Sequence, residues 1–216
     1  MRESIGSSVS RPLTAAGLDQ DQPNLYPPAT FLGIVVEPTV VNVVGTITYQ
    51  QEIALDALAD AFSRRGEITD VTYEPTENHW LQTRFAPDDT YVAFYRNGRC
   101  SIAGGNSVEH FYEVADRVNT LMREILQFEY EPTVEISNIV ATADIGTSIP
   151  LEALTLELGM EQTEYEPEQF PALMYREEDY VMLVFASGKL LCTGLTDVAD
   201  VTDAIEQMES RLRAVV

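Results

Sequence analysis

Cysteine and long apolar runs are both scarce in this 216-residue chain. Its two cysteines, Cys100 and Cys192, are too few for a disulfide framework or a spaced set of metal ligands. Both lie among apolar, β-rich residues, and we interpret them as small buried side chains rather than nucleophiles. No apolar run approaches the length of a membrane span, and the opening MRESIGSSVS lacks the apolar core of a signal peptide. These absences predict a cytoplasmic protein with no membrane partner.

Histidine is almost absent as well. His79 and His110 are the two histidines of the chain, and we find neither at metal-ligand spacing from cysteine or carboxylates. The glycine pair in AGGN (103–106), before a helix-like segment, is weak evidence for phosphate binding. We therefore predict a protein that is not an enzyme and has no catalytic residues, no metal and no cofactor.

Basic residues are also few, and lysine is the rarest of them. The chain has one lysine, Lys189, among 13 basic residues, against 35 acidic residues, which gives a formal net charge of −22. A hydrophobic share of 45% argues against disorder. Such a protein suits a cytosol with molar salt, where the Debye length is about 3 Å and charge repulsion is screened. The alternative is an acidic protein from an ordinary cell, but the scarcity of lysine favours a halophile.

What the sequence does contain is one pattern written twice. Residues 1–30 are rich in Ser, Pro, Gln and Asp, and this composition predicts a mobile tail at residues 1–36. After them, four segments recur in the same order: EPTVVNVVGT (37–46) with EPTVEISNIVAT (131–142), LDALADAF (55–62) with LEALTLEL (151–158), YEPTENHWLQTR (73–84) with YEPEQFPALMYR (165–176), and YVAFYRNGRCSIAGG (91–105) with VMLVFASGKLLCTG (181–194). A long amphipathic helix pattern closes each copy.

This order predicts a duplicated α+β fold with repeats at 37–128 and 129–216. Each copy consists of a strand, a helix, several strands and a long helix, so that helices cover one face of a sheet. Two such units side by side can share one continuous sheet about a pseudo-two-fold axis.

Three segments of the second half resemble the TATA-box-binding proteins of archaea and eukaryotes in residue type, order and spacing. They are ISNIVATADIG (136–146), YEPEQFPALMYR (165–176) and VFASGKLLCTG (184–194). The first half is similar in outline, and together the halves cover residues 37–216. The resemblance implies a saddle, with a curved antiparallel sheet of about ten strands and four helices on its convex face. It also implies that the concave face lies in the DNA minor groove and that apolar wedges kink the duplex.

The resemblance places Asn42 and Asn138 at the two central positions of the saddle. The minor groove at A·T pairs presents acceptors, so a short amide donor near the dyad suits it. By strand alternation, Val44 and Val140 point to the same face and offer flat apolar contact. The alternative is that each asparagine is an edge or turn residue bonded to the backbone.

The wedges of the family correspond to Phe170, which precedes a proline, and Phe185 in the second half. Without the resemblance, both would be interpreted as core residues. Beyond them, the family's positions for phosphate and groove-floor contact hold Lys189, Leu191 and Thr193, and Arg176 is a further phosphate candidate.

The first half departs from this pattern. Tyr95 and Arg99 are workable replacements for Phe185 and Lys189, while Ser101 and Ala103 stand for Leu191 and Thr193. Asn78, however, holds the position of Phe170 and is not a wedge, and Trp80 would substitute only in a rebuilt loop. We therefore expect an asymmetric grip in which the second repeat makes most of the DNA bend.

A net charge of −22 opposes DNA binding, because affinity ordinarily comes from phosphate neutralisation by basic residues. The distribution of charge is more favourable than its sum: no acid occurs at 90–108 or at 180–196, the windows that hold Arg96, Arg99 and Lys189. Acid-free strands are also what a buried sheet shows. In molar salt, apolar and wedge contacts must supply most of the affinity.

Two functions remain open at this level. The first is a general transcription initiation factor, associated with the nucleoid, that binds and bends A·T-rich promoter DNA as a monomer and recruits transcription factor B. The second is a regulatory or protein-interaction relative with weakened DNA binding. In the family, the loop at 166–170 docks transcription factor B, so the resemblance assigns partner binding to Glu166 and Glu168; their alternative is solvated surface charge.

Overall fold

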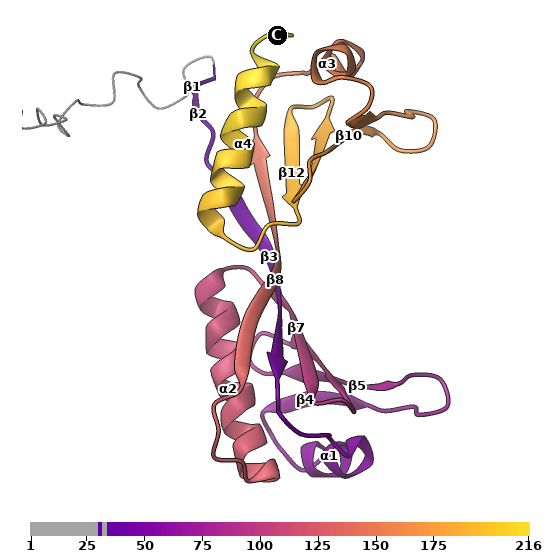
Figure 1. Cartoon of the computed structure of the whole chain (residues 1–216), viewed down its shortest axis with the longest axis vertical. Coiled ribbons are helices and arrows are strands. Elements are labelled where there is room, and N and C mark those ends of the chain that lie inside the picture. Colours follow the sequence, from indigo (N-terminus) through magenta and orange to yellow (C-terminus); the bar gives the residue numbers. More distant parts are fainter. Residues whose placement is uncertain (1–29, 32–33) are drawn as a thin grey trace, which may run out of the picture.

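The computed structural model describes residues 30–31 and 34–216 of the chain (Figure 1). Most of the predicted tail, residues 1–29 and 32–33, lies outside the described residues. Within that N-terminal stretch, β1 (Thr30–Phe31) and β2 (Ile34–Val35) pair as a two-stranded antiparallel sheet.

The remaining elements follow one order twice, which confirms the duplication. The first set is β3 (Thr39–Thr48), α1 (Leu55–Phe62), β4 (Ile68–Thr72), β5 (Trp80–Phe85), β6 (Thr90–Tyr95), β7 (Arg99–Gly105) and α2 (Val108–Leu126). The second set is β8 (Thr133–Asp144), α3 (Leu151–Leu158), β9 (Thr163–Glu164), β10 (Ala172–Arg176), β11 (Val181–Phe185), β12 (Lys189–Thr193) and α4 (Val198–Leu212).

One ten-stranded antiparallel sheet joins the two sets, in the order β4-β5-β6-β7-β3-β8-β12-β11-β10-β9. This order reads the same from either end once equivalent strands are exchanged. At its centre β3 pairs with β8, and the register places Val43 opposite Ile139, Asn42 opposite Val140 and Val44 opposite Asn138. The pseudo-two-fold axis therefore passes through the Val43–Ile139 pair.

The core lies between this sheet and the helices. Side chains alternate along the central strands, and Val43, Ile47, Ile139 and Ala141 are each 0% exposed on the helix side. Figure 1 shows α2 and α4 lying along one side of the sheet, with α1 and α3 at its two ends. The opposite side of the sheet carries no helix in the described part of the chain, and we call it the open face.

Close helix packing constrains one position in β3. A Cβ added at Gly45 would lie 2.2 Å from Cζ of Phe111 on α2, so a larger residue would force the helix away from the sheet. Phe111 itself is 0% exposed. Ser107 starts α2, because its hydroxyl accepts a hydrogen bond from the N–H of His110, and Asp197 caps α4 in the same way through the N–H of Ala199.

Candidate nucleic-acid interface

The two central asparagines hold the same orientation on the open face. The Oδ1 atom of Asn42 accepts a hydrogen bond from the N–H of Gly104 at 2.9 Å. Equivalently, Oδ1 of Asn138 accepts from the N–H of Gly194 at 2.7 Å and from the hydroxyl of Thr193 at 3.1 Å. Because a backbone N–H can only donate, these bonds hold the oxygen of each amide toward the backbone of the neighbouring strand end. The amide nitrogen, which carries two donor hydrogens, is thus the group that each side chain presents.

Apolar side chains flank these donors. Val44 lies opposite Asn138 and Val140 opposite Asn42, so the four predicted central residues form one crossed cluster at the dyad. All four are half-buried, and each has at least one buried neighbour in sequence. Leu191, also half-buried, lies farther out on the same face. The cluster combines hydrogen-bond donors with flat apolar surface, and the hydroxyl of Thr193 helps to orient Asn138 within it.

The second-repeat aromatic pair stands at one end of the face. Phe170 is 43% exposed in the β9–β10 loop, and its ring centroid lies 6.4 Å from that of Phe185 at an interplanar angle of 63°. The N–H groups of Gln169 and Phe170 both donate to the carbonyl of Glu166, at 2.9 and 3.0 Å, which fixes the loop. The exposure of Phe170 excludes the interpretation as a core residue.

The first repeat also has an aromatic pair at its end of the face, although Trp80 lies two residues beyond the position equivalent to Phe170. Its loop has the same turn, since the N–H of Asn78 donates to the carbonyl of Glu74 at 2.8 Å, and Asn78 takes the position of Phe170. The Trp80 ring centroid nevertheless lies 6.3 Å from that of Tyr95. The chain thus places Trp80 against Tyr95 from the start of β5, and the expectation that Trp80 would replace a wedge only in a rebuilt loop stays a prediction. Burial raises the pKa of Tyr95 above that of a free tyrosine.

The predicted phosphate contacts differ in availability. Arg99 and Lys189 are exposed at the first residues of β7 and β12. Arg176 is also exposed, but its guanidinium lies 3.7 Å from a carboxylate oxygen of Glu164 on the neighbouring strand. Arg176 must therefore weaken this exposed ion pair before it meets a phosphate, although such pairs are worth only about 0.2–1 kcal/mol.

Sequence reasoning missed further residues of the open face. Gln82 and Arg84 follow Trp80 at alternate positions of β5, and the guanidinium of Arg84 lies 5.3 Å from the ring centroid of Tyr91. Alternate residues of a strand share a face, so counting by two from Trp80 would have identified both residues from the sequence.

Glu135 was missed for a different reason. It pairs with Thr46 and is exposed on the open face. Strict alternation from Asn138 would put Glu135 on the helix side, but the β3–β8 register shifts between Val44 and Gly45 and inserts one extra residue. Such a β-bulge reverses which face later residues occupy, and no local sequence pattern marks it here.

The predicted partner residues lie at the second-repeat end. Glu166 and Glu168 are both exposed in the β9–β10 loop. The side-chain amide of Gln169 donates to the carboxylate of Glu166, which helps to hold that acid in place. Figure 1 shows the β4–β5 and β9–β10 loops projecting at opposite ends of the molecule, on the side away from α2 and α4.

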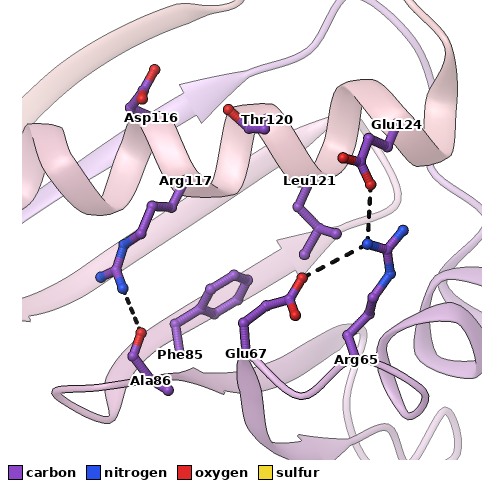
Figure 2. Close-up of a pocket in the computed structure, with 9 residues that line it drawn as sticks. All are labelled: Arg65, Glu67, Phe85, Ala86, Asp116, Arg117, Thr120, Leu121 and Glu124. Carbon is purple, nitrogen blue, oxygen red and sulfur yellow. Dashed lines mark hydrogen bonds and ion pairs between the residues drawn. The ribbon is translucent and has the colours of Figure 1, made fainter.

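A separate pocket of about 250 Å³ lies beneath α2 and contains none of the predicted residues (Figure 2). Arg65 crosses it, with Nη1 3.0 Å from Glu124 and 3.8 Å from Glu67. Arg117 donates to the backbone carbonyl of Ala86. Both guanidinium groups are thus already held, and we interpret this pocket as a clamp between α2 and the strands.

Two general findings limit other kinds of site. Among residues 30–31 and 34–216, no group of three or more His, Cys, Asp or Glu side chains is placed to hold a metal. No helix in the same residues is long and apolar enough to cross a membrane. Both cysteines are buried, as predicted, and burial raises the pKa of the Cys192 thiol to about 11.

Comparison with known proteins agrees with this geometry. The family model described as Transcription factor TFIID (or TATA-binding protein, TBP) matches residues 37–125 and 133–215. The chain belongs to this family. TATA-box-binding protein F of Halobacterium salinarum is 34% identical over 174 residues, which cover 79% of this chain and 90% of that protein. The TATA-box-binding protein of Archaeoglobus fulgidus is 34% identical over 175 residues, 80% of this chain and 92% of that protein.

A solved structure shows the same saddle. Methanococcus jannaschii TBP matches with a TM-score of 0.70 and 31% identity, over 83% of this chain and 99% of that one. The predicted fold and family are therefore confirmed, and the chain is a transcription factor of the TBP type. Haloarchaeal relatives agree with the interpretation of the −22 charge as a halophilic feature.

Proposed function

We propose that this TBP-family protein binds A·T-rich promoter DNA as a monomer, with its open face in the minor groove, and bends it. The central asparagines carry this proposal. Their oxygens are held by Gly104 and Gly194, so two amide nitrogens lie about the dyad, each beside a valine. The floor of the minor groove at A·T pairs offers the acceptors N3 and O2, which these donors complement.

The aromatic pairs support the bending part of the proposal. An apolar side chain inserted between base steps offsets the few kcal/mol that unstacking costs. Phe170 and Phe185 are suited to this at one end, and Trp80 and Tyr95 stand at the other. The second-repeat pair is the more exposed and fully apolar, so we assign it most of the bend.

A gel-shift titration in molar KCl tests this proposal. The A·T-rich fragment should be retained by the protein, and a G·C duplex of the same length should not. Bending is measured on the same fragment, labelled at both ends for energy transfer, and Phe185→Ala should reduce it. Equal retention of both duplexes would contradict minor-groove recognition of A·T pairs.

We further propose that this protein is associated with the nucleoid and recruits transcription factor B. The factor would dock on the β9–β10 loop. Glu166 and Glu168 are exposed at this end, and the equivalent first-repeat loop differs in having a threonine in place of the second acid. Replacing both with arginine should abolish the ternary complex and leave the binary DNA complex intact or tighter. The matched control reverses Glu74 and Glu77 in the first-repeat loop. Ternary assembly that survives the second-repeat reversal at several salt concentrations would exclude this docking site.

A second function is favoured by two observations on the open face. Asn78 stands where a wedge is expected, and the carboxylate of Glu135 is exposed on the side that would face DNA. Both features suit a regulatory relative that keeps the saddle but grips DNA weakly. Retention of A·T-rich DNA only at low salt, together with unchanged binding of transcription factor B, would favour this second function.

A further inference from the structure

Two rows of side chains cross the open face at equivalent positions on either side of the Val43–Ile139 pair. The strand register defines them, because residues paired on neighbouring strands lie side by side on one face. The first-repeat row consists of Gln82, Ala93, Ser101, Thr46 and Glu135. The second-repeat row consists of Met174, Leu183, Leu191, Thr142 and Thr39.

The two rows share a threonine at Thr46 and Thr142 but differ in chemistry on the outer strands. In the first-repeat row, the amide of Gln82, the hydroxyl of Ser101 and the carboxylate of Glu135 all carry oxygen atoms that accept hydrogen bonds. The equivalent positions of the second-repeat row hold a methionine, a leucine and a threonine, and a second leucine replaces the small Ala93. The duplication thus presents one polar row and one mainly apolar row to the same ligand.

Side chains of both rows line hollows that are open to the minor groove of a bound DNA duplex. Ser101 and Thr46 line a hollow of about 380 Å³ on the first-repeat side. Leu191 and Thr142 line a hollow of about 640 Å³ at the equivalent place on the second-repeat side. Gln82 is half-buried and Glu135 is exposed, so both side chains retain accessible surface on the open face.

The chemistry of the minor groove turns this difference into sequence selectivity. A G·C pair differs from an A·T pair there by one group, the N2 amino group of guanine, which is a hydrogen-bond donor. Against leucine side chains this donor loses its water and gains no partner, which is costly. Against serine, glutamine or glutamate oxygens it is satisfied. An acceptor-only carboxylate such as Glu135 has, in contrast, no partner on the floor of an A·T pair.

We propose that the first-repeat row accepts a G·C base pair and that the second-repeat row excludes one. Gln82, Ser101 and Glu135 are then specificity-determining residues, and the chain reads a composite element of an A·T-only half and a G·C-tolerant half. This inference rests on the proposed function, since it requires the open face to lie in the minor groove. A single composite element also gives a pseudo-symmetric protein a defined orientation on DNA.

Inosine isolates the group in question, because an I·C pair lacks the N2 amino group and otherwise keeps the pairing of G·C. The test uses a short A·T element in which a G·C or an I·C pair replaces one A·T pair, either in one half or in each half. For each placement, the ratio of Kd with guanine to Kd with inosine is measured. With guanine in one half, the protein can place it under the first repeat, so the ratio should stay within about twofold. With guanine in both halves, one must lie under the second repeat, and the ratio should rise about tenfold or more.

Exchange variants test the residues themselves. Ser101→Leu should raise the ratio of Kd with guanine to Kd with inosine to about tenfold for the one-half duplex. Leu191→Ser should lower the ratio for the two-half duplex. Ser210→Leu, an exposed change on α4, is the matched control and should change neither ratio. Circular dichroism of each variant establishes that the fold is kept, and Gln82→Met provides a second exchange if Ser101→Leu does not fold.

Three results would overturn the inference. A tenfold ratio with guanine in one half alone would mean that neither row tolerates G·C, and a ratio near one with guanine in both halves would mean that neither row excludes it. Either result leaves the proposed function standing, because the A·T element is still bound. Failure to bind the A·T-only element at any salt concentration would overturn the proposed function and the inference together.

Discussion

Replacing Asn138 by aspartate separates the fold of this protein from its binding of DNA. The change exchanges the amide nitrogen for an oxygen and keeps the shape of the side chain. The remaining oxygen still accepts from the N–H of Gly194 and the hydroxyl of Thr193, which are 2.7 and 3.1 Å away in the native protein. The free energy of unfolding should therefore change by less than about 1 kcal/mol.

Binding should respond very differently. One donor to the acceptors of the groove floor is lost, which costs about 1–3 kcal/mol when its partner is left desolvated. A carboxylate then faces those acceptors without a donor, which adds a desolvation penalty of similar size. The combined loss is about 3 kcal/mol, or roughly a hundredfold in Kd.

Fluorescence anisotropy with an A·T-rich duplex in molar KCl measures the Kd, and urea unfolding measures the stability. Asn119→Asp is the control for added charge: its Oδ1 accepts from the hydroxyl of Tyr49 at 2.9 Å, and it lies on α2 rather than on the open face. A folded Asn138→Asp protein that binds within threefold of the parent would refute the view that this amide nitrogen contacts the groove floor.

Four further changes test other parts of the molecule. Phe170→Ala should reduce the energy-transfer bend sharply, and an unchanged bend would remove it from the wedge. Trp80→Ala should reduce the bend by a smaller amount whereas Asn78→Ala should not; equal effects would contradict the assignment of the first-repeat pair. Gly45→Ala, whose Cβ would lie 2.2 Å from a ring atom of α2, should cost about 2–3 kcal/mol in thermal unfolding, and a loss under about 0.5 kcal/mol would show that the helix shifts freely. Burial raises the pKa of the Cys192 thiol to about 11, so the folded state keeps it neutral while the unfolded state ionises nearer 9. The contribution of the neutral Cys192 thiol to stability is therefore complete below pH 9 and is lost as pH rises toward 11. A Cys192→Ser protein should lose less stability over that range. An identical pH dependence in both proteins would contradict the raised pKa of this thiol.

The fold was predictable because the chain repeats itself. Once EPTVVNVVGT and EPTVEISNIVAT are aligned, one strand from each copy must occupy equivalent places, and a shared sheet follows from their pairing. The order of elements and the helix-covered face follow from this alignment, whereas the central positions of Asn42 and Asn138 were implied by the resemblance to the TATA-box-binding proteins. The spacing of the motifs therefore predicted the duplication and the shared sheet, and the resemblance supplied the saddle shape.

The details that were not predictable depend on contacts between residues distant in sequence. The extra residue in β8 that turns Glu135 to the open face is visible only in the register with β3. Trp80 aligns with a buried alanine, Ala172, and its half-buried position against Tyr95 depends on the pairing of β5 with β6. The ion pair of Arg176 likewise depends on how β9 and β10 are paired. Local sequence does not encode these registers.

The central β3–β8 pairing has a consequence for the autonomy of the two repeats. Residues Thr39–Thr48 of one repeat bond to Thr133–Thr142 of the other along nearly their whole length. A cut between the repeats would leave each fragment with a long unpaired strand edge, which is a template for association. Two such fragments mixed in solution would complement one another, and either fragment alone would satisfy its edge by pairing with its own copy about a true two-fold axis. The covalent chain thus behaves as a tethered heterodimer. Each repeat is free to diverge in sequence because the covalent link keeps the other repeat beside it.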